Sequence, residues 1–191
     1  MENVYHNLDK IVLSIRKSSS ILERIPEKCS SKVFYSKIRP FLSGWPEKGV
    51  IYEGVSDNPM KFVGGSAAQS SLLQSIDLIL GVNHNHPDSS PFLLEMRNYM
   101  PRKHRDFIKY IQSLTPLKDY IDNSGISELK EKINLCFESL EGFRNKHLKI
   151  ALNYIKRQKM DETTYLGTGS TDFVSFLNRT KTETAKSKID I

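Results

Sequence analysis

Cysteine is scarce in this sequence, and its placement excludes two classes of protein. Only Cys29 and Cys136 occur among the 191 residues, far apart and without Cys-x-x-Cys spacing. Small secreted domains carry many cysteines in a disulfide framework, and zinc sites use closely spaced ligand pairs. We therefore expect two free thiols in a reducing compartment and no structural zinc site.

Long apolar runs and targeting signals are also missing. The longest apolar stretch, residues 72–82, is interrupted by Gln74, Ser75 and Asp77. A helix that spans a bilayer needs about 20 largely apolar residues. The N-terminus lacks the basic and apolar blocks of a secretory signal peptide. These absences predict a soluble cytoplasmic protein with no membrane partner.

The excess of positive charge is small. The 28 Lys and Arg exceed the 22 Asp and Glu by six, and the excess is spread along the chain. Basic clusters at 102–105 and 156–157 could make the chain a basic helical interaction module. Such clusters are more often solvated helix faces, however, and no aromatic residues alternate with them as in single-strand binders. We therefore expect no nucleic-acid partner.

The spacing of apolar residues predicts an all-α domain, a helical bundle with very little strand. Residues 43–65 contain many Gly and Pro residues and predict one long irregular loop, with 50–52 as its only strand-like piece. Thr115 and Ser127 are the predicted N-caps of the last two helices before residue 158. We expect a single helical domain over 1–180 and a disordered charged tail over 181–191. Helices are predicted over residues 4–25, 32–42, 66–82, 92–100, 102–114, 127–158 and a short segment ending at 179.

His147 lies in the middle of an apolar stripe on the last long helix. The stripe consists of Cys136, Leu140, Phe143, His147, Ile150 and Tyr154, at alternating steps of four and three. A buried imidazole without a partner costs roughly 1–3 kcal/mol. It is either a core histidine bonded to a carbonyl or carboxylate, or a ligand that projects into the bundle core. One histidine without a second ligand nearby suits heme better than zinc.

Arg144 shares a helix face with His147, because three residues separate them. A partly buried guanidinium needs an anion, and Asp77 has the complementary need in the middle of an apolar helix. We expect Arg144 and Asp77 to pair across two core helices. The pair either orients the imidazole or serves as a structural ion pair.

Two more segments suit a binding site. Residues 64–68 open a helix with small side chains and would let a flat or anionic group approach free backbone N–H groups, although a tight turn is the commoner structure. Residues 34–39 place Phe34 or Tyr35 one turn from Arg39. These could hold an aromatic amino acid by its ring and carboxylate, or be a core aromatic and a solvated arginine.

Taken together, these segments resemble the indoleamine 2,3-dioxygenase family. The resemblance spans almost the whole chain in the family's order, so it is far more specific than any one motif. It is carried by FYSKIRPFLSGW (34–45), VIYEG (50–54), FVGGSAAQSS (62–71), Asp77, LG (80–81), MR (96–97), YMP (99–101), HR (104–105), Arg144, HLKI (147–150), YI (154–155) and GTGSTD (167–172).

The resemblance implies an enzyme that contains heme b and inserts both atoms of O2 across the indole C2–C3 bond of L-tryptophan or a related indoleamine. The product would be N-formylkynurenine, in the first step of the kynurenine pathway of tryptophan catabolism. His147 would be the proximal ligand of the heme iron, with Arg144 and Asp77 beside it. Ser66 and Ala67 would lie against the heme.

The resemblance also assigns the substrate side. Phe34 and Arg39 would face the substrate, with Arg39 binding its carboxylate. A lid formed by Gly167, Thr168, Gly169, Ser170 and Thr171 would close over the site, with Thr168 touching the substrate. Two residues depart from the family pattern. Ser170 replaces a common glycine, and Tyr35 replaces a common phenylalanine.

The match corresponds to the C-terminal part of the family's catalytic domain, and we expect the N-terminal region to be missing. That region supplies part of the pocket wall in the family. Self-association or a missing N-terminal segment are the two ways to complete the wall. The alternative function is therefore a non-catalytic heme-binding fragment or a degenerate paralogue.

Overall fold

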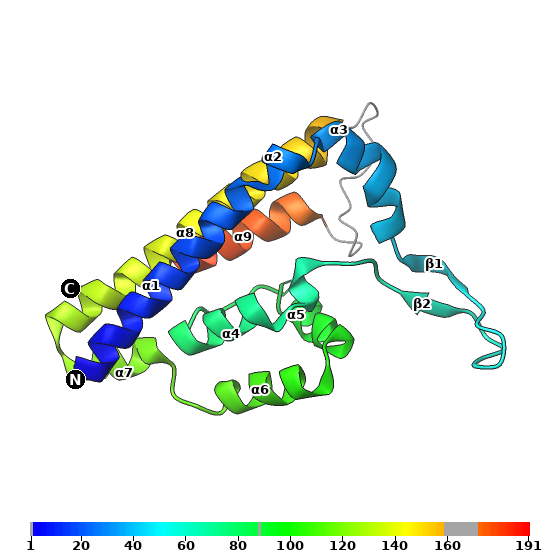
Figure 1. The fold of residues 1–191 in the computed structure, drawn as a ribbon. Coiled ribbons are helices and arrows are strands. Elements are labelled where there is room, and N and C mark those ends of the chain that lie inside the picture. The colour runs from blue at the N-terminus through cyan, green and yellow to red at the C-terminus, as the bar shows by residue number, and fades with distance from the viewer. Residues whose placement is uncertain (1, 88, 159–171) are drawn as a thin grey trace.

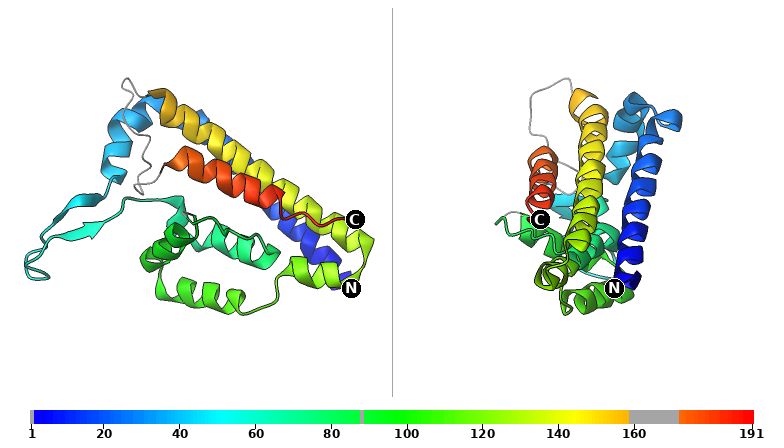
Figure 2. Two further views of the ribbon diagram at one scale, coloured as in Figure 1. Left: turned by 180° about the vertical axis from the view of Figure 1, so that it is seen from behind. Right: turned by 90° about the vertical axis from the view of Figure 1, so that its left-hand side faces the viewer.

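Two long helices, α1 (Glu2–Glu23) and α8 (Ser127–Tyr154), lie side by side along the computed structural model (Figures 1 and 2). The structure describes residues 2–87, 89–158 and 172–191. Apolar residues at helical spacing on one face of α1 pack against one face of α8. Burial of these two faces is the main contribution to the stability of the helix pair. The buried residues of this interface are Leu8, Val12, Ile15, Ile133, Cys136, Phe137 and Leu140.

The C-terminal helix α9 (Phe173–Ala185) packs against α8, on a different side from α1 (Figure 2). A second layer faces these helices. Within it, α4 lies beside α6, and α7 leads into α8 (Figure 1). The elements of this layer are η3 (Ala67–Gln69), α4 (Ser71–Leu80), α5 (Ser89–Met96), η4 (Arg97–Tyr99), α6 (Arg102–Gln112) and α7 (Leu117–Ser124).

Gly81 ends α4 because its φ of 87° lies in the left-handed region, where a side chain is disfavoured. This turn directs the chain away from the helix axis into residues 82–87, which return beside the end of α4 toward α9. Val82 N–H donates to the Asp77 carbonyl at 2.8 Å, which fixes the start of that segment.

The chain between α1 and the second layer first lies against the end of α8 and then forms an arm, residues 39–62, that projects away from the helices (Figure 1). Its strands pair antiparallel, with Trp45 opposite Phe62 and Val50 opposite Met60. Gly44 is required at its base, since a Cβ there would collide with the Phe62 carbonyl. The elements of this part are α2 (Ile25–Lys28), α3 (Ser31–Val33), the π-helical turn η1 (Phe34–Ile38), η2 (Arg39–Leu42), β1 (Trp45–Val50) and β2 (Met60–Phe62); η5 (Lys156–Gln158) follows α8.

The all-α prediction is confirmed, and four local expectations need correction. The expected irregular loop contains a two-stranded sheet, because residues 45–50 find a partner farther along the chain. Thr115 is not the cap of α7, since Pro116 occupies that position. Ser127 is the first residue of α8, which follows Ile126 without a side-chain cap. The helix ends at Tyr154, where the chain tightens into η5.

The expectation of a disordered tail over 181–191 also differs from the structure. Residues 181–185 continue α9, and the segment beyond it returns along α8. Ile189 is only 7% exposed, and its backbone N–H donates to Asn134 Oδ1 at 2.9 Å. Asn134 Nδ2 in turn donates to the Ile189 carbonyl at 2.9 Å. The charged composition of the segment gave no sign of this contact. A single apolar residue, Ile189, is enough to hold the segment against α8.

Among the described residues, the structure contains no helix whose length and apolar character would suffice to cross a membrane.

Candidate functional site

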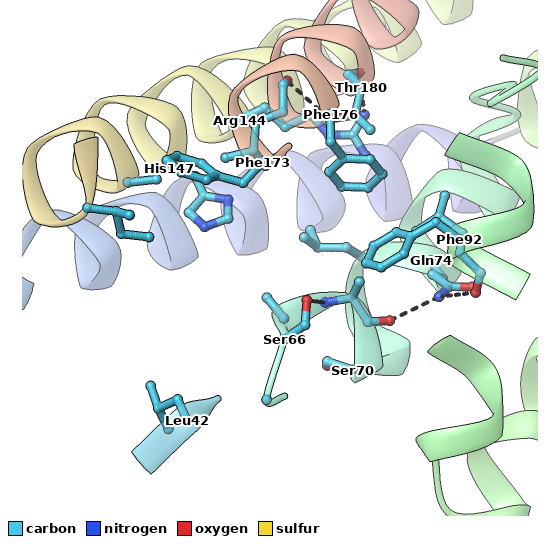
Figure 3. A pocket seen from close by; sticks show the side chains of 18 of the residues that line it. Leu42, Ser66, Ser70, Gln74, Phe92, Arg144, His147, Phe173, Phe176 and Thr180 are labelled. Carbon is cyan, nitrogen blue, oxygen red and sulfur yellow. Dashed lines mark hydrogen bonds between the residues drawn. The ribbon is translucent and has the colours of Figure 1, made fainter. Parts of the chain in front are cut away.

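A cavity of about 330 Å³ lies between α8, α9, the start of α4 and the η1–η2 segment (Figure 3). This volume falls at the lower end of the ~300–1,000 Å³ typical of small-molecule sites. Its walls are largely apolar, with a few polar side chains among them. The apolar lining is formed by Leu42, Leu73, Phe92, Leu93, Ala151, Ile155, Phe173, Phe176 and Leu177.

His147 projects from α8 into this cavity (Figure 3). Its ring lies beside that of Phe143, with centroids 6.5 Å apart and planes tilted by 39°. Within the described part of the chain, no hydrogen bond to the imidazole is present. Burial lowers the pKa of His147, and the nearby positive charge of Arg144 lowers it further. The imidazole is therefore held in the neutral form, which is the form that ligates a metal.

Arg144 and Asp77 form the expected pair. Arg144 Nη2 lies 2.7 Å and 2.6 Å from the two carboxylate oxygens of Asp77. Both side chains are almost completely buried. Arg144 Nη1 donates to the Thr180 carbonyl at 3.0 Å and also to Thr184 Oγ1, so the guanidinium joins α4, α8 and α9. Among the described residues, no hydrogen bond joins the His147 ring to the Asp77 carboxylate, so the pair does not orient the imidazole by direct bonding.

A second buried contact extends the pair. His84, in the segment after α4, lies between two carboxylates, with Nε2 3.0 Å from Asp77 Oδ2 and Nδ1 2.5 Å from Glu183 Oε2. Burial alone would lower the pKa of His84, but the hydrogen bonds and charge of Asp77 and the bond to Glu183 outweigh it and raise this pKa. Arg144 opposes that rise. The result is one buried network across three helices.

The predicted small-residue segment forms the wall opposite α8. Ser66 caps η3 by accepting from Ala68 N–H at 3.3 Å, and Gln69 Oε1 accepts from Ser66 N–H at 3.2 Å. This reciprocal cap fixes the backbone at the cavity edge. A Cβ built on Gly65 meets no heavy atom within 4 Å, so the space beside Gly65 is open. A flat group can therefore approach this segment closely.

Phe34 and Arg39 line the cavity from the η1–η2 segment. Phe34 packs edge-to-face on Tyr154 of α8, with ring centroids 5.7 Å apart. The Tyr154 hydroxyl donates to the Cys29 carbonyl, which ties the same segment to the end of α8. The Arg39 guanidinium lies 5.5 Å from the centroid of the Tyr35 ring. An aromatic face and a cation thus stand together at the cavity edge, as the spacing of residues 34–39 indicated.

The cavity brings together most of the side chains predicted from sequence. Lining residues among them are Phe34, Arg39, Ser66, Ala67, Asp77, Arg144 and His147. The predicted lid residues Gly167, Thr168, Gly169, Ser170 and Thr171 lie outside the described residues. The roles assigned to all these residues stay predictions.

The wall contributed by α9 and the segment after α4 was not predicted. Phe176 of α9 packs edge-to-face on Phe92 of α5, with centroids 5.2 Å apart. Gln74, 4% exposed, donates to the carbonyls of Ala68 and Leu93 and so ties η3 to α5. The only sequence signal for these residues was that Phe173 and Phe176 fall on one face of a short helix.

The residues that surround the cavity fit a heme group. A neutral imidazole such as that of His147 could ligate a heme iron, and the apolar side chains would exclude water from a bound porphyrin. The space beside Gly65 is free of side chains within 4 Å of its Cβ position, which would let a flat ring approach the backbone there. In the part of the chain that the structure describes, no cluster of three or more His, Cys, Asp or Glu side chains could hold a bare metal ion.

Comparison with known proteins shows the family of this chain. The model of the family "Indoleamine 2,3-dioxygenase" matches residues 1–187. Indoleamine 2,3-dioxygenase 1 of Rattus norvegicus is 37% identical over 94% of this chain and 49% of its own length. The corresponding protein of Saccharomyces cerevisiae is 38% identical over 80% and 37%. A protein named myoglobin from Haliotis madaka is 31% identical over 92% and 49%.

The chain thus spans about half the length, or less, of the curated relatives it matches. The family match covers residues 1–187, nearly the whole chain. The chain therefore belongs to the indoleamine 2,3-dioxygenase family.

Proposed function

We propose that this chain binds heme b through His147 and takes part in the oxidative cleavage of the indole C2–C3 bond of L-tryptophan, or a related indoleamine, by O2. The product is N-formylkynurenine. Members of this family are heme-dependent dioxygenases, which supports the reaction class. The observation that carries the proposal is the neutral, partly buried imidazole of His147 in a largely apolar cavity.

Each cavity residue has a role in this proposal. His147 ligates the iron, and Ser66 and Ala67 form the small-residue edge along which the ring lies. The heme, when bound, supplies the O2 chemistry. Phe34 holds the indole by ring contact, and Arg39 pairs with the substrate carboxylate. The apolar wall excludes water from the reacting centre, which preserves the reactive species.

The proposal is tested by heme reconstitution. We expect the purified chain with hemin to give a Soret band, and the ferrous form with L-tryptophan and O2 to release N-formylkynurenine, detected by its absorbance and mass. His147→Ala should lose the Soret band. His6→Ala, which alters an exposed histidine of α1, is the matched control and should keep it. An unchanged heme spectrum in His147→Ala would overturn the ligand assignment.

A second function is favoured by the relatives named myoglobin. On that alternative the chain is a non-catalytic heme protein that keeps the imidazole site without turning over an indole. The same reconstitution separates the two functions. A Soret band together with no product from L-tryptophan, D-tryptophan or tryptamine supports the non-catalytic alternative and excludes the catalytic proposal for this chain alone.

The proposal includes a covering segment over the arm, either a second copy of the chain or polypeptide corresponding to the unmatched part of the relatives. Apolar side chains on the arm support it, since Phe41 is 88% and Val55 73% exposed. Sedimentation of the holo form distinguishes a dimer from a monomer.

We also propose the cytoplasm as the compartment of this protein, because both described cysteines are free.

A further inference from the structure

The ring of His84 joins two helices that are far apart in the sequence. Asp77 comes from α4 and Glu183 from α9, and each places a carboxylate oxygen on a different ring nitrogen of His84. The three side chains are only 7–16% exposed. The contact therefore joins α4 to α9 through the segment that follows α4.

The chemistry of the contact determines the protonation state of the ring. An ionised carboxylate only accepts hydrogen bonds, so a ring with a carboxylate on each nitrogen must donate from both. Only the imidazolium does this. With Arg144 the group then holds two positive and two negative charges and is neutral. Removing the proton from His84 would leave net negative charge in a buried place and a ring lone pair facing a carboxylate oxygen.

We infer that His84 is a positioning residue, whose imidazolium holds α9 against α4 and thereby fixes the wall that α9 gives to the cavity. The helix supplies Phe173, Phe176, Leu177 and Thr180 to the cavity lining. Two side-chain groups of the second layer link it to α9 by polar contacts: the Asp77 carboxylate, through Arg144, and the ring of His84. This inference rests on the proposed function insofar as that wall encloses heme.

Charged groups reach His84 from every helix packed around it. Asp77 of α4 and Glu183 of α9 stabilise the imidazolium, and Arg144 of α8 opposes it. On the other side, Arg97 lines a polar cavity together with His84, and its guanidinium is bonded to the side chains of Gln74 and Gln112. The balance raises the pKa of His84.

The sign of the pH effect follows from that direction. A histidine whose pKa is higher in the folded than in the unfolded chain stabilises the fold fully below its unfolded value of 6.5. That contribution falls as the pH rises from there through the folded pKa and is absent above it. Docking of α9 should therefore weaken on the alkaline side, by at most about tenfold in the opening constant per pH unit.

The first experiment uses the full chain without heme and compares it with Glu183→Gln. The glutamine keeps the shape and one acceptor oxygen but removes the charge. We expect ¹⁵N NMR to show both ring nitrogens of His84 protonated at pH 6.5 in the wild type, and the transition to move to lower pH in Glu183→Gln. Hydrogen exchange of the α9 amides at pH 6.5 should be about tenfold faster in the variant, because the charge-assisted bond between His84 and Glu183 is lost.

Glu138→Gln is the matched control, because Glu138 also joins α8 to the C-terminal segment, by an exposed contact with Lys188 at 3.3 Å. Exchange of α9 in this variant should stay within about twofold of the wild type. A neutral His84 ring at pH 6.5, or equal exchange in Glu183→Gln and Glu138→Gln, would overturn the inference.

The second experiment measures the rate at which heme leaves the reconstituted chain for an apo heme-scavenging protein. We expect heme loss in Glu183→Gln to be about tenfold faster than in Glu138→Gln, with the Soret position unchanged because His147 is intact. If the wild-type chain binds no heme, the proposed function fails, and the NMR and exchange results on the apo chain still decide the role of His84. Faster exchange of α9 without faster heme loss would overturn the link to the cavity.

Discussion

The Arg144–Asp77 pair is buried, so each charge needs the other to remain stable away from water. Removal of one partner leaves an uncompensated charge away from water, which typically costs about 3–5 kcal/mol. Arg144→Met should lower the free energy of unfolding by that amount, measured by urea denaturation at pH 7. The Asp77 carboxylate would retain only the His84 contact, and the bonds to Thr180 and Thr184 would be lost.

Lys146→Met is the control for that measurement. Lys146 lies on α8, as Arg144 does, but its contact with Glu23 of α1, at 2.8 Å, is at the surface. Exposed ion pairs contribute about 0–1 kcal/mol. Equal destabilisation by the two variants would show that the buried ion pair of Arg144 contributes no more to the free energy of unfolding than an exposed one.

Cys136 provides a second test at the residue scale. Burial raises the pKa of its thiol to about 12, the charge of Asp9 adds to that rise, and its Sγ lies 3.7 Å from the Leu8 carbonyl. At pH 8.5 roughly one thiol in three thousand is then ionised. In a Cys29→Ser variant we expect alkylation by iodoacetamide, followed by mass spectrometry, to stay slow until urea unfolds the chain. Rapid alkylation in the folded state would contradict the burial of this α1–α8 contact.

At the scale of elements, the arm depends on one close backbone approach. Gly44→Ala would place a Cβ against the carbonyl of Phe62, which must shift the base of the arm at a cost of about 1–3 kcal/mol. Trp45, the single tryptophan in the sequence, should report the shift by its fluorescence. Gly142→Ala is the counterpart within α8, where a Cβ meets no heavy atom within 4 Å. It should stabilise the chain by about 0.5–1 kcal/mol, and a fluorescence change in that variant would be unexpected.

The elements and contacts that could be predicted from sequence are those set by neighbouring residues or by the need of a buried charge for a partner. The position of His147 follows from the 3.6-residue period of α8, and the Arg144–Asp77 pair follows because each buried charge needs a partner. The strands were missed because residues 45–50 become a strand only by pairing with 60–62. The contact of His84 with Glu183 joins residues 99 positions apart, and neither local segment shows an apolar pattern that indicates burial.

At the scale of the whole molecule, the cavity links ligand binding to stability. A ligand that binds only the folded chain stabilises it by about 2.7 kcal/mol when its free concentration is one hundred times its Kd. We expect hemin to raise the unfolding temperature of the chain in calorimetry, and the rise to disappear in His147→Ala. A rise of equal size in that variant would show that heme binds elsewhere.

The pairing of α1 with α8 has a consequence for synthesis of the chain. Leu8 touches Cys136 across 128 positions, so α1 must wait for more than a hundred residues to be made before its partner helix exists. At about 5–20 residues per second, that delay is on the order of ten seconds. During it the apolar stripe of α1 is open to water and to other nascent chains, and chaperones that bind short apolar helices should find their target there. Closing so large a loop also slows folding relative to bundles built from neighbouring helices.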